Sequence, residues 1–224
     1  MSQDAVWLAG SIAGSSATII NSPSSATFTL NFAAPYSFLN AGGQPSVFVN
    51  NATFDSIGAG AATLQFAFQN NDNATLRASG SGLVYFAGGG YNNGTATFGP
   101  AATVQLGGVF SLLPNSTFAG SGKAILSGTV NVDSLFNVSG STEVSDGQTN
   151  FNLDATLANF GNPLTGTRPI LSRFLFVFPL LTFSPYFFLS FFPSERWYRG
   201  SLRAAAERAV AVHRERWSDA HSLP

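Results

Sequence analysis

The residue types that do most enzyme chemistry are scarce in this chain. Its two histidines, His213 and His221, lie near the C-terminal end, and it has no cysteine. A Ser-His-Asp triad, a Cys-His pair and the common zinc sites all need an imidazole or a thiolate. Residues 1–167 contain neither group, so we expect no catalytic residue, no metal ligand and no cofactor there, and we expect a protein that is not an enzyme.

One acidic pair supports the alternative of an enzyme. Asp133 and Asp154 hold equivalent positions in two successive copies of a repeat, so their carboxylates would stack, where they could bind a hard cation or act as an acid and base couple. The basic residues of the same region, Arg77 and Lys123, belong to other copies. The simpler interpretation is that both aspartates bond to the backbone at turns.

Charge divides the chain into two parts. Residues 1–167 hold two basic and seven acidic residues, a formal charge of −5, whereas residues 168–224 hold eight arginines and four acidic residues, a formal charge of +4. Because the first part has no basic stripe that could neutralise phosphates, we expect no nucleic-acid partner for it. The two parts are expected to occupy different environments.

A short triplet, Ala-Thr-Phe or a close variant of it, returns at near-regular intervals. Its last residues are Phe28, Phe54, Leu76, Phe98, Phe118, Phe136 and Leu157, which are 26, 22, 22, 20, 18 and 21 residues apart. Small turn-forming residues precede each copy and glycines follow several of them. A period of about 20 to 22 residues with small insertions is typical of a β-solenoid. We therefore predict an all-β parallel β-solenoid, with an antiparallel β-sandwich as the alternative and residues 1–20 as a cap.

Within each triplet the side chains should alternate between two faces. In a strand, the phenylalanine and the alanine share one face and the threonine takes the other. If the phenylalanines stack inside, one outward column of threonines follows. It consists of Thr27, Thr53, Thr75, Thr97, Thr117 and Thr156, interrupted by Leu135. Such a regular array could bind a repeating ligand, either a polysaccharide or an ice lattice, and it is the candidate binding surface.

The segments "STFAGSGKAILSGTVNV" (116–132) and "LFNVSGSTEVSDG" (135–147) resemble the repeats of right-handed parallel β-helix surface proteins of the adhesin and autotransporter-passenger type. The resemblance extends over about residues 50–160 of the chain. It implies extracellular adhesion or a stalk-like scaffold. Related β-helix proteins include polysaccharide lyases and hydrolases, and others bind ice.

Five copies of the sequon Asn-x-Thr/Ser begin at Asn51, Asn73, Asn93, Asn115 and Asn137. In a secreted protein of a eukaryote, such asparagines could carry glycans. The simpler interpretation is that turns favour asparagine and strands favour threonine, so that the motif arises by itself.

The C-terminal part differs from the repeats. Residues 168–194 include the uncharged segment 174–193, which is long and apolar enough to span a bilayer, although its prolines disfavour a helix. Residues 195–224 predict a short, basic, amphipathic helix on the cytosolic side. An alternative is that this tail is mistranslated or poorly folded. The first residues lack the basic start of a signal peptide, which suggests an incomplete N-terminus or an unusual export route.

Taken together, these patterns predict a non-enzymatic repeat domain over residues 1–167 that lies outside the cell or on its surface. We expect it to serve adhesion or to act as a structural scaffold, with a polysaccharide or another cell-surface ligand as its partner. Segment 174–193 would tether it to a membrane. The alternatives are a carbohydrate-active β-helix enzyme and a protein that binds ice or glycans through its threonine column.

Overall fold

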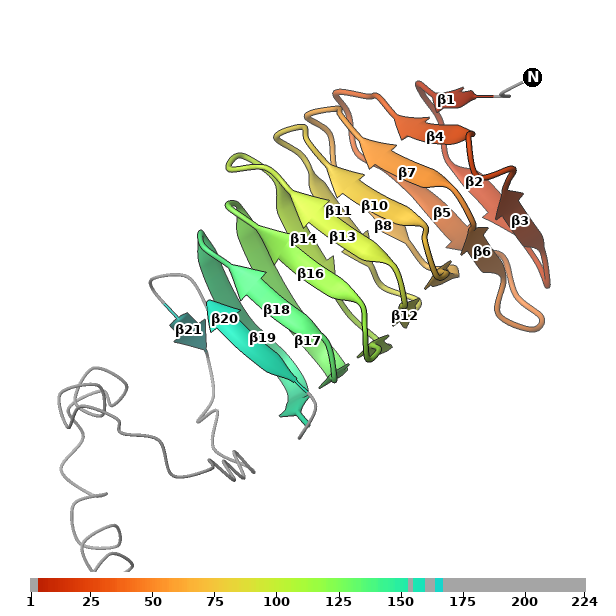
Figure 1. Cartoon of the computed structure of the whole chain (residues 1–224). Helices are drawn as coiled ribbons and strands as arrows, with labels where there is room; N and C mark the ends of the chain where they lie inside the picture. The colour runs from red at the N-terminus through yellow and green to blue at the C-terminus, as the bar shows by residue number, and fades with distance from the viewer. Residues whose placement is uncertain (1–3, 153–154, 160–163, 167–224) are drawn as a thin grey trace, which may run out of the picture. The chain divides into compact units, whose positions relative to one another are not determined.

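The computed structural model describes residues 4–152, 155–159 and 164–166, and every regular element in these ranges is a β-strand. The strands stack in register along one direction, so that each winding of the chain forms one rung of a solenoid (Figure 1). All strand pairs within the described ranges are parallel. The predicted parallel β-solenoid is confirmed, and the antiparallel β-sandwich is wrong.

One side of the solenoid, face 1, is a sheet of eight strands. In stacking order these are β1 (Ala5–Trp7), β4 (Thr27–Leu30), β7 (Thr53–Ser56), β10 (Thr75–Ala78), β13 (Thr95–Phe98), β16 (Thr117–Gly120), β18 (Leu135–Val138) and β20 (Thr156–Asn159). Equivalent residues on successive strands, from Thr27 to Thr156, are 26, 22, 20, 22, 18 and 21 residues apart.

The other two sides belong to one sheet of thirteen strands. Face 2 contains β2 (Ile12–Gly14), β5 (Tyr36–Asn40), β8 (Ala62–Leu64), β11 (Leu83–Phe86), β14 (Thr103–Leu106) and β21 (Leu164–Gly166). Face 3 contains β3 (Thr18–Asn21), β6 (Val47–Asn50), β9 (Ala67–Asn70), β12 (Gly90–Asn92) and β15 (Val109–Leu112). Two long strands, β17 (Lys123–Val132) and β19 (Ser141–Phe151), run through both faces and join them.

The core lies inside the solenoid and consists of columns of side chains from successive rungs. Phe28 stacks on Phe54 with ring centroids 5.9 Å apart, and Phe118 stacks on Phe136 at 5.5 Å. Such ring pairs add about 0.5 to 1.5 kcal/mol each beyond the burial of their area. The expected internal phenylalanine stack is therefore present, because alternate residues of each strand point inward. The exception is Phe98, since Ala96 takes the equivalent place between Leu76 and Phe118.

Glycines form two of the three corners between the faces, as the sequence indicates. At the corner between faces 1 and 2, a Cβ added to Gly82 would lie 2.2 Å from the carbonyl oxygen of Gly60 on the neighbouring rung. At the corner between faces 2 and 3, Gly128 and Gly147 pair with each other and have φ angles of 97° and 81°. Close contact at the first corner and a left-handed backbone at the second both require glycine.

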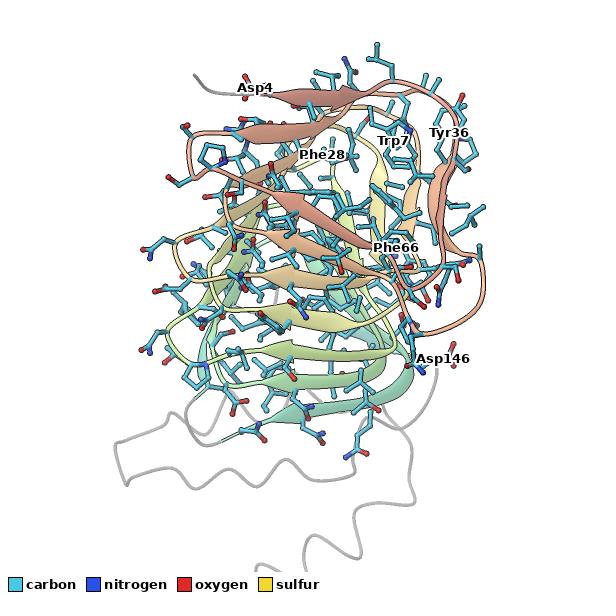
Figure 2. All side chains as sticks on the ribbon, turned by 90° about the vertical axis from the view of Figure 1, so that its right-hand side faces the viewer. Asp4, Trp7, Phe28, Tyr36, Phe66 and Asp146 are labelled. Atoms are coloured by element: carbon cyan, nitrogen blue, oxygen red, sulfur yellow. The ribbon has the colours of Figure 1, made fainter. Side chains whose placement is uncertain are left out.

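The first rung is built from β1, β2 and β3, so residues 5–21 continue the solenoid rather than form a separate cap. Trp7 closes its interior, with its ring centroid 4.6 Å from that of Phe38 and 5.1 Å from that of Phe32. Its indole nitrogen donates to the carbonyl oxygen of Gly10 at 2.7 Å. Trp7 and Tyr36 lie at the same end of the solenoid (Figure 2).

The corner between faces 3 and 1, which we call the third corner, alternates in length along the solenoid. It contains two residues at 51–52, 93–94 and 133–134, and four residues at 71–74 and 113–116. The first such corner, 22–26, has five residues. Short and long corners therefore follow each other on successive rungs.

Candidate functional site

Face 1 presents an outward column of threonines, as the sequence predicts, but with one change of register. The column consists of Thr27, Thr53, Thr75, Thr95, Thr117 and Thr156, with Leu135 between the last two. Thr95 and Thr156 are exposed and the other members are half-buried. Successive hydroxyls are expected about 4.8 Å apart, which is the spacing between neighbouring strands.

The inclusion of Thr97 in this column is wrong. Thr97 pairs with Arg77 and Ala119, two residues farther along the strand, and Thr95 takes the expected place. The reason lies inside the solenoid, where the ring of Phe98 is level with the small residues Ala78 and Gly120. A Cβ added to Gly120 would lie 2.4 Å from Cδ2 of Phe98, so this ring occupies the space that the glycine leaves.

A second outward column runs beside the threonines and contains a charged pair. Arg77 Nε donates to Asp55 Oδ2 at 3.0 Å, and Ser79 Oγ donates to Asp55 Oδ1 at 3.3 Å. The Asp55 side chain is only 5% exposed, whereas that of Arg77 is 53% exposed. The hydrogen bond and the negative charge of Asp55 raise the pKa of Arg77, and partial burial opposes them. The guanidinium is therefore held in place and charged.

A shallow depression of about 380 Å³ lies next to this arginine, over the ends of β10, β13 and β16. Ser79, Thr97 and Ser121 supply hydroxyl groups to its lining. The half-buried residues Ala119 and Gly120 contribute small side chains, and the buried ring of Phe98 lies beneath them. A depression that combines small residues with a few hydroxyl groups has room for a small ligand or for one unit of a polymer.

The predicted acidic pair stays a prediction, because the structure describes only one of its two members. Asp133 is half-buried at the third corner, where its backbone N–H donates to the carbonyl oxygen of Leu112 at 2.8 Å. Asp154 lies outside the described residues. Among the residues that the structure describes, no group of three or more His, Cys, Asp or Glu side chains could hold a metal ion.

The basic residue on face 2 is also paired. Lys123 Nζ lies 2.6 Å from Glu143 Oε2, its partner on the next rung. Both side chains are partly exposed, at 42% and 25%, so we expect this pair to contribute little to stability.

Sequence reasoning missed a buried ladder of four asparagines, Asn21, Asn50, Asn70 and Asn92, at the end of face 3. Nδ2 of each of the first three donates to the Oδ1 of the next member at 2.7 Å. The same amides also donate to carbonyl oxygens at the third corner, such as that of Ala52 at 3.1 Å. The signal in the sequence is an asparagine at the last position of the face 3 strand on four successive rungs. Only the register of the stacked strands shows that these asparagine side chains point inward.

The apolar segment 174–193 and the basic tail 195–224 lie outside the described residues. Within the described ranges, the structure contains no helix that is long and apolar enough to cross a membrane. No family model, curated protein or solved structure matches this chain.

Proposed function

We propose that this protein is a non-enzymatic β-solenoid of the cell surface or extracellular space that binds a polysaccharide along face 1 and serves adhesion or scaffolding. The observation that carries the proposal is the outward column of threonines on six of seven consecutive rungs. A polysaccharide repeats its own hydroxyl groups along one axis. A column of equivalent hydroxyls can therefore bind it through many weak contacts that act together.

The depression beside Arg77 supports the same ligand class. Sugar rings have apolar faces and hydroxyl edges, and the depression offers the half-buried small residues Ala119 and Gly120 next to Thr97 and Ser121. Arg77 adds a donor that the buried Asp55 holds in position. Because Asp55 balances this charge and residues 1–167 carry a formal charge of −5, we favour a neutral polysaccharide over a polyanion.

The second column makes an ice lattice the weaker alternative. An ice plane requires a uniform surface, and the threonines of face 1 stand beside Arg77, whose half-exposed guanidinium is strongly hydrated and breaks that uniformity. A polysaccharide tolerates a mixed surface because its hydroxyls accept and donate hydrogen bonds.

The test compares binding of the unglycosylated full chain, produced in bacteria, with binding of variants to a panel of neutral and acidic polysaccharides. Replacing Thr75, Thr95 and Thr117 together by lysine should lower the affinity at least about tenfold, which corresponds to about 1.4 kcal/mol. Replacing the same three residues by valine keeps the β-branched shape and removes only the hydroxyls.

A matched control places lysines on the other faces, at Thr63, Thr103 and Thr129, which are half-buried like most of the column. This variant should bind as the unchanged protein does. If the unchanged chain binds no polysaccharide, or if the control variant loses affinity equally, the proposal is wrong. Thermal hysteresis of the unchanged chain, lost in the face 1 variant, would favour the ice lattice instead.

A further inference from the structure

The third corner sorts four of the sequons into two structural classes. In all four, the threonine belongs to the outward column, so the asparagine always lies two residues before it. Asn51 and Asn93 are at two-residue corners, whereas Asn73 and Asn115 are at four-residue corners. The sequence shows four similar motifs, and only the fold shows that they alternate.

At the long corners, the asparagine stands at the tip of a β-turn. The N–H of Ala74 donates to the carbonyl oxygen of Asn71, and that of Ser116 donates to the carbonyl oxygen of Leu113, both at 3.1 Å. Asn73 and Asn115 have φ angles of 62° and 69°. These are the hydrogen bond and the left-handed third residue of a type II turn, a position that asparagine tolerates. Both asparagines are exposed.

At the short corners, the asparagine is part of the stack of rungs. The N–H of Asn51 donates to the carbonyl oxygen of Asn21 at 3.0 Å, and that of Asn93 donates to the carbonyl oxygen of Asn70 at 2.8 Å. Asn51 Oδ1 also accepts a hydrogen bond from Asn71 Nδ2 at 2.6 Å. Both asparagines are half-buried.

The long corners crowd the short ones. Gly94, which follows Asn93, packs directly against the preceding long corner: a Cβ at this position would lie 2.2 Å from the carbonyl oxygen of Ala74 and 2.6 Å from that of Asn71. A glycan on a short corner would have to project between two neighbouring turns. Glycans on successive rungs would be only about 4.8 Å apart, which is less than the width of a sugar chain, whereas those on alternate rungs have about twice that distance.

We propose that Asn73 and Asn115 are acceptor sites for N-linked glycans, whereas Asn51 and Asn93 serve the fold alone. The donor is an oligosaccharide linked to a lipid pyrophosphate. The Asn amide nitrogen forms a bond to the anomeric carbon, the bond from that carbon to the pyrophosphate oxygen breaks, the lipid pyrophosphate leaves, and one amide proton passes to a base of the transferase. No oxidation or reduction takes place.

This arrangement leaves the depression on face 1 accessible. The two acceptor asparagines precede β10 and β16, whereas the depression lies at the opposite ends of the same strands, around Ser79 and Ser121. Glycans at the third corner would border face 1 on one side. The inference does not depend on the proposed polysaccharide binding.

The test is expression of the full chain, with a cleavable signal peptide, in the secretory pathway of cultured eukaryotic cells. Mass spectrometry of peptides released by an amidase that cleaves N-glycans then gives the occupancy of each asparagine. Asn73 and Asn115 should be occupied in most molecules, and Asn51 and Asn93 should be at least about tenfold less occupied. Chains retained inside the cell are measured in the same way as secreted ones.

Two matched pairs of variants remove the sequons without changing the turns. Thr75→Val with Thr117→Val should abolish two mobility shifts that are sensitive to the amidase, and Thr53→Val with Thr95→Val should abolish none. Asn137, which lies on β18 and not at a corner, is unchanged in all variants. Equal occupancy on short and long corners, or no occupancy at Asn73 and Asn115, would overturn the inference.

Discussion

At the scale of single residues, the buried asparagine ladder shows how polar side chains can lie in an apolar solenoid. Asn50 and Asn70 are fully buried, and each amide has partners on both the neighbouring rung and the third corner. A buried polar group costs about 1 to 3 kcal/mol when it loses its partner, so the ladder is stable only if it is continuous. It ends at Leu112, where an apolar residue takes the equivalent position.

We expect Asn70→Ala to destabilise the protein by about 2 to 3 kcal/mol, because it orphans Asn92 Oδ1 and leaves a small cavity. Asn92→Leu should cost less, about 1 to 2 kcal/mol, because Asn70 loses the acceptor of one N–H bond but keeps its bond to the carbonyl oxygen of Ala74. The leucine leaves no cavity, since it continues the apolar column of Leu112 and Val132. Urea unfolding followed by circular dichroism measures both. Equal losses would show that the ladder does not act as a connected unit.

Face 1 also contains a polar pair with a buried member, the ion pair of Arg77 and Asp55. The pKa of Arg77 is raised by its partner, so the guanidinium stays charged at every pH below the ordinary arginine range. A raised folded-state pKa contributes stability that is fully present below the unfolded pKa and is lost only when the pH rises through the folded value. The contribution from Arg77 is therefore constant through neutral pH.

At the scale of elements, the register of β13 depends on how its inward side chains fit their neighbours. Phe98 is accommodated because Gly120 on β16 has no side chain and Ala78 on β10 has a small one. A large ring and a glycine on adjacent rungs therefore act as a complementary pair. Because protein interiors are densely packed, adding a single methyl group there changes the stability.

Gly120→Ala should lower the stability by about 1 to 3 kcal/mol, because the new methyl group overlaps the ring of Phe98. Adding Phe98→Leu in the same chain should recover part of that loss. A double-mutant cycle on the midpoints of thermal unfolding gives the coupling energy, which we expect to reach about 0.5 kcal/mol or more. Additive effects of the two substitutions would contradict this packing.

At the scale of the whole molecule, the repeats and the C-terminal part differ in composition. The described strands end with β21 at Gly166, and the arginine-rich part of the sequence begins at Arg168. Each rung of a solenoid packs mainly against its neighbours, so its stability comes from contacts between adjacent rungs.

We therefore predict that a chain ending at Thr167 folds by itself. It should be soluble, give a β-type circular dichroism spectrum and unfold cooperatively, because the rungs supply each other's hydrogen bonds and core. Gel filtration and circular dichroism check this. Aggregation or a random-coil spectrum would indicate that the last rung needs residues beyond 167 as a cap.

The sequence by itself determined the period, the parallel solenoid and the glycine corners. These depend on local signals, namely the alternation within a strand and the residues that a turn accepts, and such signals return in each copy of the repeat. Five of the six predicted threonines, all except Thr97, also lie in the outward column for this reason.

Only the tertiary structure decided which residues of neighbouring rungs lie opposite each other. Thr95 replaces Thr97 because Phe98 needs the space above Gly120, a residue on the next rung. The inward direction of the asparagine ladder and the alternation of exposed and half-buried sequons depend on the same stacking. These features arise from packing between residues about twenty positions apart, and no local pattern in the sequence records how such residues fit together.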